Sequence, residues 1–192
     1  WSLHEYKGWK GPVVRNISTT HRLDAMEKDF GEQCYEVPVG FKYVSAKIDE
    51  TNAVIGGESY GGLTVRGHIF GKDSIYAASL FIEMLSVTGL PPAQIIDKLE
   101  NKYGKVVFLD KAISLTPEKK EQILKKIMED KGLPKFEGVS KVSYLDGCKV
   151  YFEDGSFVIC RPSGTEPVLR LMAEAKTEAA CISYIQGFEA II

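Results

Sequence analysis

The sequence lacks the features that mark membrane, secreted and nucleic-acid-binding proteins. No apolar run in its 192 residues approaches the roughly 20 residues that a membrane-spanning helix needs. Its start shows no basic-then-apolar pattern typical of a signal peptide. Lys and Arg number 24 against 26 Asp and Glu, a formal net charge of −2, whereas nucleic-acid-binding domains usually carry a basic excess. We therefore expect a cytoplasmic protein without a membrane or nucleic-acid partner.

Cysteine is scarce and scattered. There are 4 cysteines, and no two of them stand in a C-x-x-C spacing. This pattern predicts buried thiols in a reducing compartment instead of a disulfide framework or a zinc site. The sequence also has no cluster of aspartates, so we expect no metal site among these residues. The cysteines are Cys34, Cys148, Cys160 and Cys181.

Residues 1–104 predict an α/β domain with a mixed, mainly parallel sheet. Apolar, β-branched runs alternate with amphipathic segments through short links, which is typical of parallel strands joined by right-handed crossovers. The helix expected over 74–88 is apolar on nearly all sides, which predicts burial on several sides. The expected strands are 13–18, 34–39 and 53–55, and the expected helices are 21–30, 74–88 and one that opens at Pro91-Pro92 and ends at Gly104.

Residues 105–192 predict an α+β domain with an antiparallel sheet and two helices. Thr116-Pro117-Glu118 combines a helix cap, a proline suited to the first helical position and a first-turn acid. Asp154-Gly155 is a hairpin signal. The expected strands are 106–109, 112–115, 139–145, 149–153, 157–160 and 169–174, and the helices begin at Thr116 and near Glu178.

Between the last two strands lies the stretch Arg161-Pro162-Ser163-Gly164-Thr165-Glu166-Pro167. Its two prolines predict that the chain leaves the sheet here, because proline gives no N–H to a ladder. The hydroxyls and the glycine offer donors for a concave anion site, and the guanidinium matches phosphate oxygens bidentately. The residue types alone support an ordinary turn equally well. Arg170, on the following strand, is a candidate either to brace a phosphate or to pair with Glu174.

Three further stretches follow predicted strands or precede a helix. In Gly56 to Gly62, four glycines surround Glu58, which could accept hydrogen bonds from sugar hydroxyls; the alternative is a flexible hairpin. In His68 to Asp73, Lys72 stands before a helix N-terminus, where a cation is unfavourable unless an anion faces it; the alternative is a solvated surface charge. Gly40-Phe41-Lys42-Tyr43 is a turn with aromatic residues.

Four motifs, taken in their order along the chain, resemble those of the α-D-phosphohexomutases, which include the phosphoglucomutases and phosphomannomutases. The motifs are G-F-K-Y, G-G-E-S-Y-G-G, H-x-x-x-K-D and R-P-S-G-T-E-P. The resemblance covers most of the third domain of that family, over residues 1–104, and the fourth domain, over 105–192. The sugar-binding loop of the family is usually G-E-x-S-G, so either Tyr60 occupies the serine position or, as in E-E-S-Y-G, Ser59 does. Val39 and Ser74 replace a threonine and a glycine of the family pattern.

The resemblance implies a role for each candidate site residue. It assigns phosphate binding to the C-terminal loop, sugar binding to the two glycine-containing turns, and an acid/base or phosphate contact to Lys72. It places two residues after the first strand, and one before the long helix, at the edge of the site. The phosphate-binding residues are Arg161, Ser163, Gly164 and Thr165; the sugar-binding residues are Glu58, Ser59, Tyr60, Gly40 and Phe41; the edge residues are His68, His21 and Arg22.

The family resemblance also implies the activity of a longer protein. Such enzymes interconvert hexose 1-phosphate and hexose 6-phosphate through a phosphoserine and a hexose 1,6-bisphosphate intermediate, with Mg²⁺, and we expect glucose phosphates as the substrates here. Neither the serine loop nor the metal loop occurs in this sequence, which begins at Trp1. We expect a piece that lacks its N-terminal domains, binds hexose phosphate and no cofactor by itself, and is inactive alone. The alternatives are a phosphomannomutase, a phosphoglucosamine mutase, a non-catalytic sugar-phosphate-binding module or a scaffold.

Overall fold

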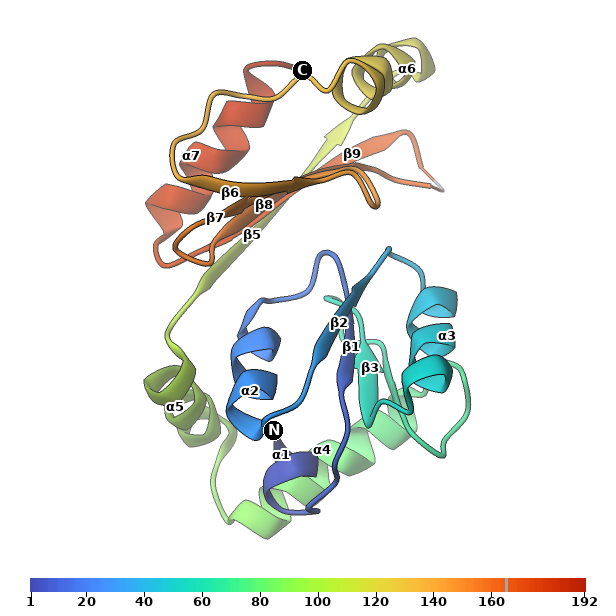
Figure 1. Ribbon diagram of the computed structural model, residues 1–192, viewed down its shortest axis with the longest axis vertical. Coiled ribbons are helices and arrows are strands. Elements are labelled where there is room, and N and C mark those ends of the chain that lie inside the picture. Colours follow the sequence, from blue (N-terminus) through green and yellow to red (C-terminus); the bar gives the residue numbers. More distant parts are fainter. Residues whose placement is uncertain (165) are drawn as a thin grey trace. The chain divides into compact units, whose positions relative to one another are not determined.

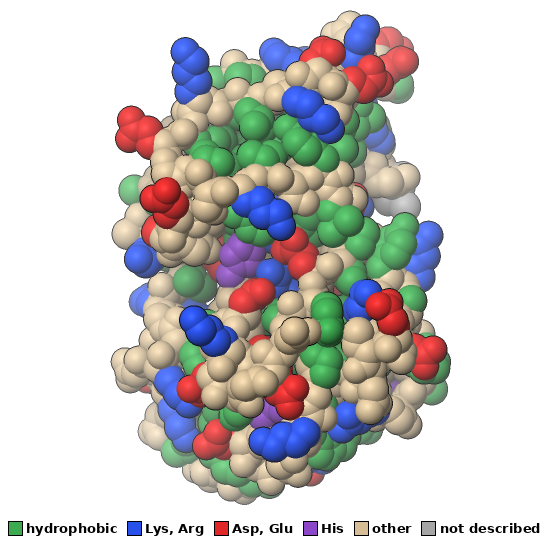
Figure 2. Space-filling model, viewed as in Figure 1, with side chains coloured by type: hydrophobic (Ala, Val, Ile, Leu, Met, Phe, Trp, Pro, Cys, Tyr) green, Lys and Arg blue, Asp and Glu red, His purple; other side chains and the backbone are tan. Residues whose placement is uncertain are grey.

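The computed structural model describes residues 1–164 and 166–192. The chain divides into two compact units, Trp1–Lys105 and Val106–Ile192, and each is described by itself (Figure 1). On the face drawn in Figure 2, cationic and anionic side chains are interspersed in each unit. Within the described residues, no single helix is long and apolar enough to cross a membrane; two consecutive helices reach that size together, but they are bent by 81°.

The first unit is a four-stranded sheet with the order β2-β1-β3-β4. β1 pairs in parallel with β2 and β3, whereas β3 and β4 are antiparallel. Figure 1 shows α2 and α3 on opposite sides of this sheet. The elements are α1 (Ser2–Glu5), β1 (Val13–Asn16), α2 (Arg22–Phe30), β2 (Cys34–Val37), α3 (Phe41–Thr51), β3 (Ile55–Gly57), β4 (Leu63–Val65), α4 (Ser74–Thr88) and α5 (Pro92–Tyr103).

The parallel strands and helix α3 form the core of this unit. Val14 of β1 packs with Val44 and Ile48 of α3, and all three are buried. A side chain at Gly56 of β3 would place its Cβ 2.6 Å from Val44 Cγ1, so only glycine lets the helix lie this close to the strand. The prediction of a mixed, mainly parallel α/β unit is confirmed. The short elements α1 and β4 were not predicted, because three- and four-residue segments carry almost no periodicity. The expectation of a turn over residues 40–43 is corrected, because Gly40 stands at the cap position and Phe41 begins helix α3.

The expectation for helix α4 is wrong in one respect. Its bounds agree with the sequence pattern, and Asp73 caps it by accepting hydrogen bonds from the amides of Ile75 and Tyr76 at 3.0 and 2.9 Å. However, none of its residues is fully buried, and Ile75 and Ile82 are 80% and 62% exposed. α4 lies beside β4, at the edge of a small sheet, so unit 1 covers it along one side only.

The second unit is a five-stranded antiparallel sheet with the order β5-β9-β8-β7-β6. Its core includes Val158, Leu171 and Phe188, which are fully buried or nearly so, and α6 and α7 lie on the same side of the sheet (Figure 1). This confirms the predicted antiparallel α+β architecture. The elements are β5 (Val107–Ser114), α6 (Pro117–Leu124), the π-helical turn η1 (Lys125–Glu129), β6 (Val139–Ser143), β7 (Cys148–Phe152), β8 (Phe157–Pro162), β9 (Val168–Ala175) and α7 (Glu178–Glu189).

Candidate functional site: a carboxylate cluster and a hairpin loop

In the first unit, polar groups meet where the parallel strands β1 and β3 end. Asn16 is the last residue of β1, and Glu58 directly follows β3. The Asn16 side-chain amide donates to Glu58 Oε1 at 3.3 Å. Carboxyl ends of neighbouring parallel strands open to the same edge of a sheet, where α/β folds bind their ligands.

Glu58 is the centre of this cluster. The Gly40 amide donates to its Oε1 at 3.0 Å, and Lys72 Nζ donates to its Oε2 at 3.0 Å. Partial burial raises the pKa of Glu58, but the hydrogen bonds from Lys72, Gly40 and Asn16 outweigh it, so that the pKa lies below its usual value. Glu58 is therefore a carboxylate at neutral pH, suited to accept hydrogen bonds and unsuited to donate a proton.

Lys72 reaches Glu58 from the loop before α4. Its side chain is 56% exposed, whereas that of Glu58 is 10% exposed, so the ammonium faces the solvent side of the carboxylate. A Cβ at Gly62 would lie 2.3 Å from Lys72 Cδ, and glycine at this position leaves the path of the lysine open. The Nζ atom also lies 5.6 Å from the centre of the Phe41 ring. The structure thus brings together Glu58, Lys72, Gly40 and Phe41, which the sequence had named separately.

Ser59 and Tyr60 lie outside this cluster. The Glu58 amide donates to the Gly62 carbonyl at 2.9 Å, and the Gly61 amide donates to the Glu58 carbonyl at 3.0 Å. These bonds close a tight turn between β3 and β4, with Ser59 and Tyr60 exposed at its tip. The glycine-rich stretch is therefore a hairpin, and Glu58 stands at the start of its turn.

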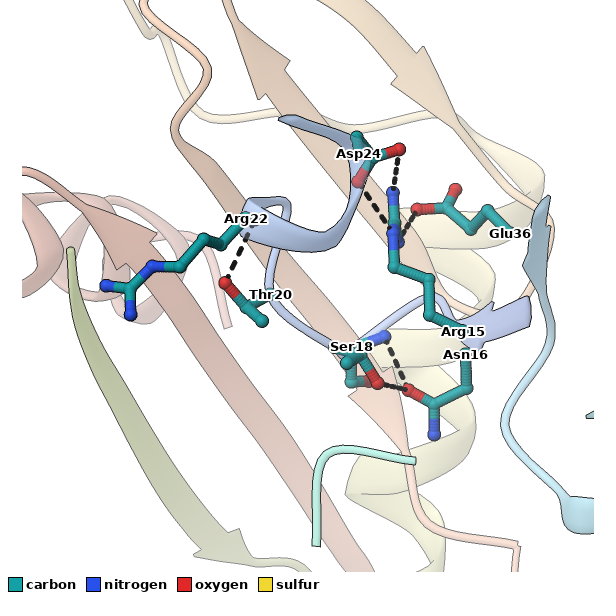
Figure 3. A network of polar contacts seen from close by, with 8 residues as sticks. Arg15, Asn16, Ser18, Thr20, Arg22, Asp24 and Glu36 are labelled. Carbon is teal, nitrogen blue, oxygen red and sulfur yellow. Dashed lines mark hydrogen bonds and ion pairs between the residues drawn. The ribbon is translucent and has the colours of Figure 1, made fainter. Parts of the chain in front are cut away.

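The loop after β1 is built by short-range hydrogen bonds (Figure 3). Asn16 Oδ1 accepts from the Ser18 amide at 3.1 Å and from the Thr19 hydroxyl at 2.7 Å. Thr20 Oγ1 accepts from the Arg22 amide at 3.1 Å, so Thr20 supports the start of α2, although His21 is the residue at the cap position. The Asn16 amide thereby links this loop to Glu58.

This loop and the start of α2 contain buried polar atoms without a hydrogen-bond partner among the described residues. They include Ser18 Oγ and Arg22 Nε; the Arg22 side chain also lies 3.7 Å from Glu100. Unpaired buried polar atoms are costly and occur at sites that take up a ligand or water. Asn16 and Ser18 were missed in the sequence; they are polar residues inside an otherwise apolar strand pattern, and that interruption was the available signal.

Arg15 and His68 support the site without facing Glu58. Arg15 donates to Asp24 at 2.8 and 3.1 Å and to Glu36 at 2.6 Å, which ties β1 to α2 and β2 (Figure 3). His68 lies 3.0 Å from Asp73 Oδ2, and its ring stacks on Tyr76 at 4.0 Å. The contacts of His68 hold the N-terminus of α4, next to Lys72.

In the second unit, the predicted phosphate loop connects β8 and β9. Arg161 Nε donates to Asp146 Oδ2 at 2.8 Å, and the Ser163 amide donates to the Val168 carbonyl at 2.8 Å across the hairpin. Ser163 Oγ accepts from the Glu166 amide at 3.3 Å. Gly164 is exposed, and Thr165 lies outside the described residues. The loop is thus a closed hairpin end that carries a guanidinium, a hydroxyl and a glycine.

Two expectations about this loop are corrected. β8 continues through Arg161 and Pro162, which pair with Arg170 and Leu169. Proline is tolerated there because β7 pairs with β8 only as far as Cys160, so that beyond this point β8 has one neighbour. Arg170 forms an ion pair with Asp110 of the adjacent strand at 3.2 Å instead of the expected Glu174, which stands four residues further along the same strand, roughly 13 Å away at the usual rise.

No group of three His, Cys, Asp or Glu side chains in the described parts of the chain could hold a metal ion. The carboxylate that is best placed at a strand end, Glu58, is already paired with Lys72. The donors of these two units therefore do not fit a Mg²⁺ site.

Comparison with known proteins defines the class to which this fold belongs. The family description "Phosphoglucomutase/phosphomannomutase, alpha/beta/alpha domain III" matches residues 1–103, and "Phosphoglucomutase/phosphomannomutase, C-terminal domain" matches residues 113–188. The chain belongs to the phosphoglucomutase/phosphomannomutase family, of which it contains domain III and the C-terminal domain.

Individual relatives are similar over nearly the whole chain. A phosphoglucomutase/phosphomannomutase of Thermococcus kodakarensis is 30% identical over 178 residues, 92% of this chain and 36% of the relative. A phosphoglucosamine/phosphogalactosamine mutase of Sulfurisphaera tokodaii is 27% identical, over 94% of this chain and 38% of the relative. The crystal structure of a family protein from Burkholderia thailandensis matches with a TM-score of 0.75 and 25% identity, over 96% of this chain and 37% of that one. This chain therefore spans little more than a third of the length of these relatives.

Proposed function

We propose that this chain is the sugar- and phosphate-binding portion of a phosphohexomutase. In the longer enzyme, residues 1–104 act as the sugar-binding domain and residues 105–192 as the phosphate-binding domain. The enzyme interconverts hexose 1-phosphate and hexose 6-phosphate through a phosphoserine and a hexose 1,6-bisphosphate. The proposal rests on the family and on the two half-sites, each described within its own unit.

The observation that carries the proposal is the Glu58 cluster. Three donors from three different segments converge on this one carboxylate. A carboxylate held in this way is preorganised to accept hydrogen bonds from the hydroxyls of a sugar ring. Lys72, which is largely exposed beside Glu58, is proposed to contact a phosphate group or to act in acid/base catalysis.

The loop at Arg161 is the candidate phosphate-binding site of the second unit. Asp146 holds the guanidinium of Arg161 in place by accepting a hydrogen bond from Nε. The terminal amino groups of the guanidinium lie outside this ion pair. Ser163 and the Gly164 amide add donors of the kind that phosphate oxygens accept. Ser59 and Tyr60, at the exposed hairpin tip, and the edge residues His21, Arg22 and His68 are proposed as further contacts of a bound sugar phosphate.

Isothermal titration of glucose 1-phosphate into the 192-residue chain tests this function. We expect saturable binding that weakens at least tenfold in Arg161→Ala, because a charge-assisted hydrogen bond contributes roughly 1.5–3 kcal/mol. Lys176→Ala, at an exposed position of the same unit, is the matched control and should bind as the wild type does. Equal affinity of all three proteins would leave a scaffold as the better description.

The preferred hexose is proposed to be glucose, and one observation favours a second candidate. The relative from Sulfurisphaera tokodaii, named for amino sugars, is similar over as much of the chain as the relative from Thermococcus kodakarensis, and a phosphomannomutase belongs to the same family. Titration of glucose 1-phosphate, mannose 1-phosphate and glucosamine 1-phosphate in parallel ranks the three sugars. At least tenfold tighter binding of glucosamine 1-phosphate would replace glucose in the proposal.

We assign the phosphoserine and Mg²⁺ to domains that precede this portion in the longer relatives, and we propose that the portion alone is inactive. Helix α4, whose apolar side chains Ile75 and Ile82 are exposed, is a candidate surface for contact with those preceding domains. The described cysteines are free thiols, which accords with action in the cytoplasm. An assay with glucose 1-phosphate, Mg²⁺ and glucose 1,6-bisphosphate tests the inactivity, and measurable turnover by the 192 residues would refute it.

A further inference from the structure

The side chain of Lys120 in helix α6 bridges two main-chain carbonyls of the phosphate loop. Its Nζ donates to the main-chain carbonyl of Ser163 at 2.9 Å and to that of Glu166 at 3.4 Å. Lys120 is half-buried, whereas its neighbour Lys119 is exposed. No residue of α6 was considered for the site when the sequence was read, because the helix lies more than 40 positions before the loop in the chain.

The position of Lys120 fixes the direction of a loop amide. A trans peptide group is planar, so its C=O and the following N–H point in opposite directions. Among the described residues, 1–164 and 166–192, the structure has no cis peptide bond. Since the Ser163 carbonyl points at Lys120, the Gly164 N–H points away from α6. The second carbonyl bound by Lys120 precedes Pro167, which has no N–H, so the Gly164 amide is the donor that this arrangement presents.

Lysine suits this task because its compact ammonium offers three donors and serves as a point charge. It cancels part of the negative potential of two carbonyl oxygens that would otherwise repel an anion on the loop. It also keeps those carbonyls turned to one side before any ligand arrives. A donor that is oriented in advance costs no reorganisation on binding.

We propose that Lys120 is a positioning residue for phosphate: it holds the loop between β8 and β9 so that the Gly164 amide faces the ligand. This inference rests on the proposed function, because it concerns how the same loop binds a phosphate group. It adds a residue from a different element to a site that otherwise consists of the hairpin alone.

The test is an NMR titration of the ¹⁵N-labelled 192-residue chain with inorganic phosphate and with glucose 1-phosphate. The amide signal of Gly164 reports the loop directly. Three variants are compared with the wild type: Lys120→Met, which keeps the length of the side chain and removes its donors; Lys120→Arg, which keeps the charge and donors; and Lys119→Met, which removes the same charge from an exposed position one residue away. Thermal unfolding of each variant verifies that it is folded.

We expect a saturable shift of the Gly164 amide in the wild type and in Lys119→Met, with affinities within twofold of each other. Lys120→Met should bind both ligands roughly tenfold more weakly and should show a displaced or broadened Gly164 signal even without ligand. Lys120→Arg should recover part of the affinity. A purely structural role would lower the melting temperature and leave the affinity of the folded protein unchanged.

The outcomes separate this inference from the proposed function. If the wild type shows no saturable shift with either ligand, the phosphate-binding function fails and the inference fails with it. If the wild type binds and Lys120→Met binds equally well, the loop is a phosphate site that does not need Lys120, and only the inference is overturned. It is also overturned if Lys119→Met weakens binding as much as Lys120→Met, because the effect would then be one of net charge.

Discussion

The two candidate half-sites are built in opposite ways. The cluster in the first unit draws Asn16, Gly40, Glu58 and Lys72 from four separate segments and centres them on one negative charge. The loop in the second unit is a single continuous hairpin that begins at the cationic Arg161, which is paired with Asp146. The first half-site therefore depends on the whole sheet and its connections, whereas the second depends mainly on one turn and the groups that brace it.

This difference agrees with the ligand groups that we propose for the two units. A sugar ring presents hydroxyls in several directions, and a polar acceptor that is held from several sides can meet them in a fixed orientation. A phosphate is compact and charged, so that amides, hydroxyls and a guanidinium within a few residues are enough to surround it. Variants that disturb one unit and spare the other can break or sharpen this comparison.

The largest effect is expected for Gly147→Ala, in the turn before β7. Gly147 has a φ of +84°, and an added Cβ would lie 2.5 Å from the Cys160 carbonyl oxygen and 2.9 Å from Arg161 Cα. The strain of the left-handed backbone and the clash with a neighbouring strand together should cost about 3 kcal/mol of unfolding free energy. Hydrogen–deuterium exchange should accelerate in the strands of the second unit and not in those of the first.

Gly155→Ala is the matched control for this variant. Gly155 has a φ of +88° in another hairpin turn of the same unit, but an added Cβ there meets no atom within 4 Å. It should cost only the backbone strain of about 1–2 kcal/mol. If both variants accelerate exchange equally, the contact between Gly147 and the start of the phosphate loop has no energetic weight.

The next effect concerns Arg161 and separates charge from geometry. Arg161→Ala should weaken phosphate binding roughly 10- to 100-fold, and Arg161→Lys should restore less than half of the lost binding free energy. Lysine keeps the charge but lacks both the Nε donor that contacts Asp146 and the planar fork that matches phosphate oxygens. Titration calorimetry with inorganic phosphate measures both. Full recovery in Arg161→Lys would mean that the loop attracts phosphate by charge alone.

The residues of the second candidate site were easier to name from the sequence than the contacts of the first, for the same structural reason. The donors from Arg161 to Gly164 are consecutive, so local chemistry and the turn signals were enough to name them. Glu58 and Lys72 were named too, but nothing in their spacing of 14 positions showed that they meet. Asn16 and Lys120 were missed because their roles arise only when β1 comes to lie beside β3 and when α6 folds back on the hairpin.

The fold followed the same rule. Long periodic segments such as α4 and α7 were located from the sequence, and so were the parallel and antiparallel characters of the two sheets. The three-residue strand β4 was not, because a segment of this length has no recognisable period. The exposure of α4 was also not predictable. Hydrophobic patterning indicates that the faces of a helix are suited to burial, but it does not identify the element that covers them.

A smaller effect is expected for Glu58→Gln in the first unit. The substitution keeps the shape of the side chain but removes the charge that Lys72 and the Gly40 amide address. We expect affinity for glucose 1-phosphate to fall roughly tenfold, the loss of one charge-assisted contact, while affinity for inorganic phosphate stays unchanged. Glu50→Gln, which removes an exposed carboxylate paired with Lys47 on α3, is the control. Equal losses for both ligands would contradict the division into a sugar half and a phosphate half.

The smallest effect is the titration of Glu58 itself. Because its pKa is lowered in the folded chain, the carboxylate contributes stability that is fully present above its unfolded value of 4.5 and is lost as the pH falls through the lower folded value. The amide shift of Gly40, which donates to this carboxylate, should therefore titrate with a midpoint below 4.5 in an NMR pH series, and the transition should disappear in Glu58→Gln. A midpoint at or above 4.5 would mean that burial outweighs the three donors, and Glu58 would then be a weaker acceptor than the cluster requires.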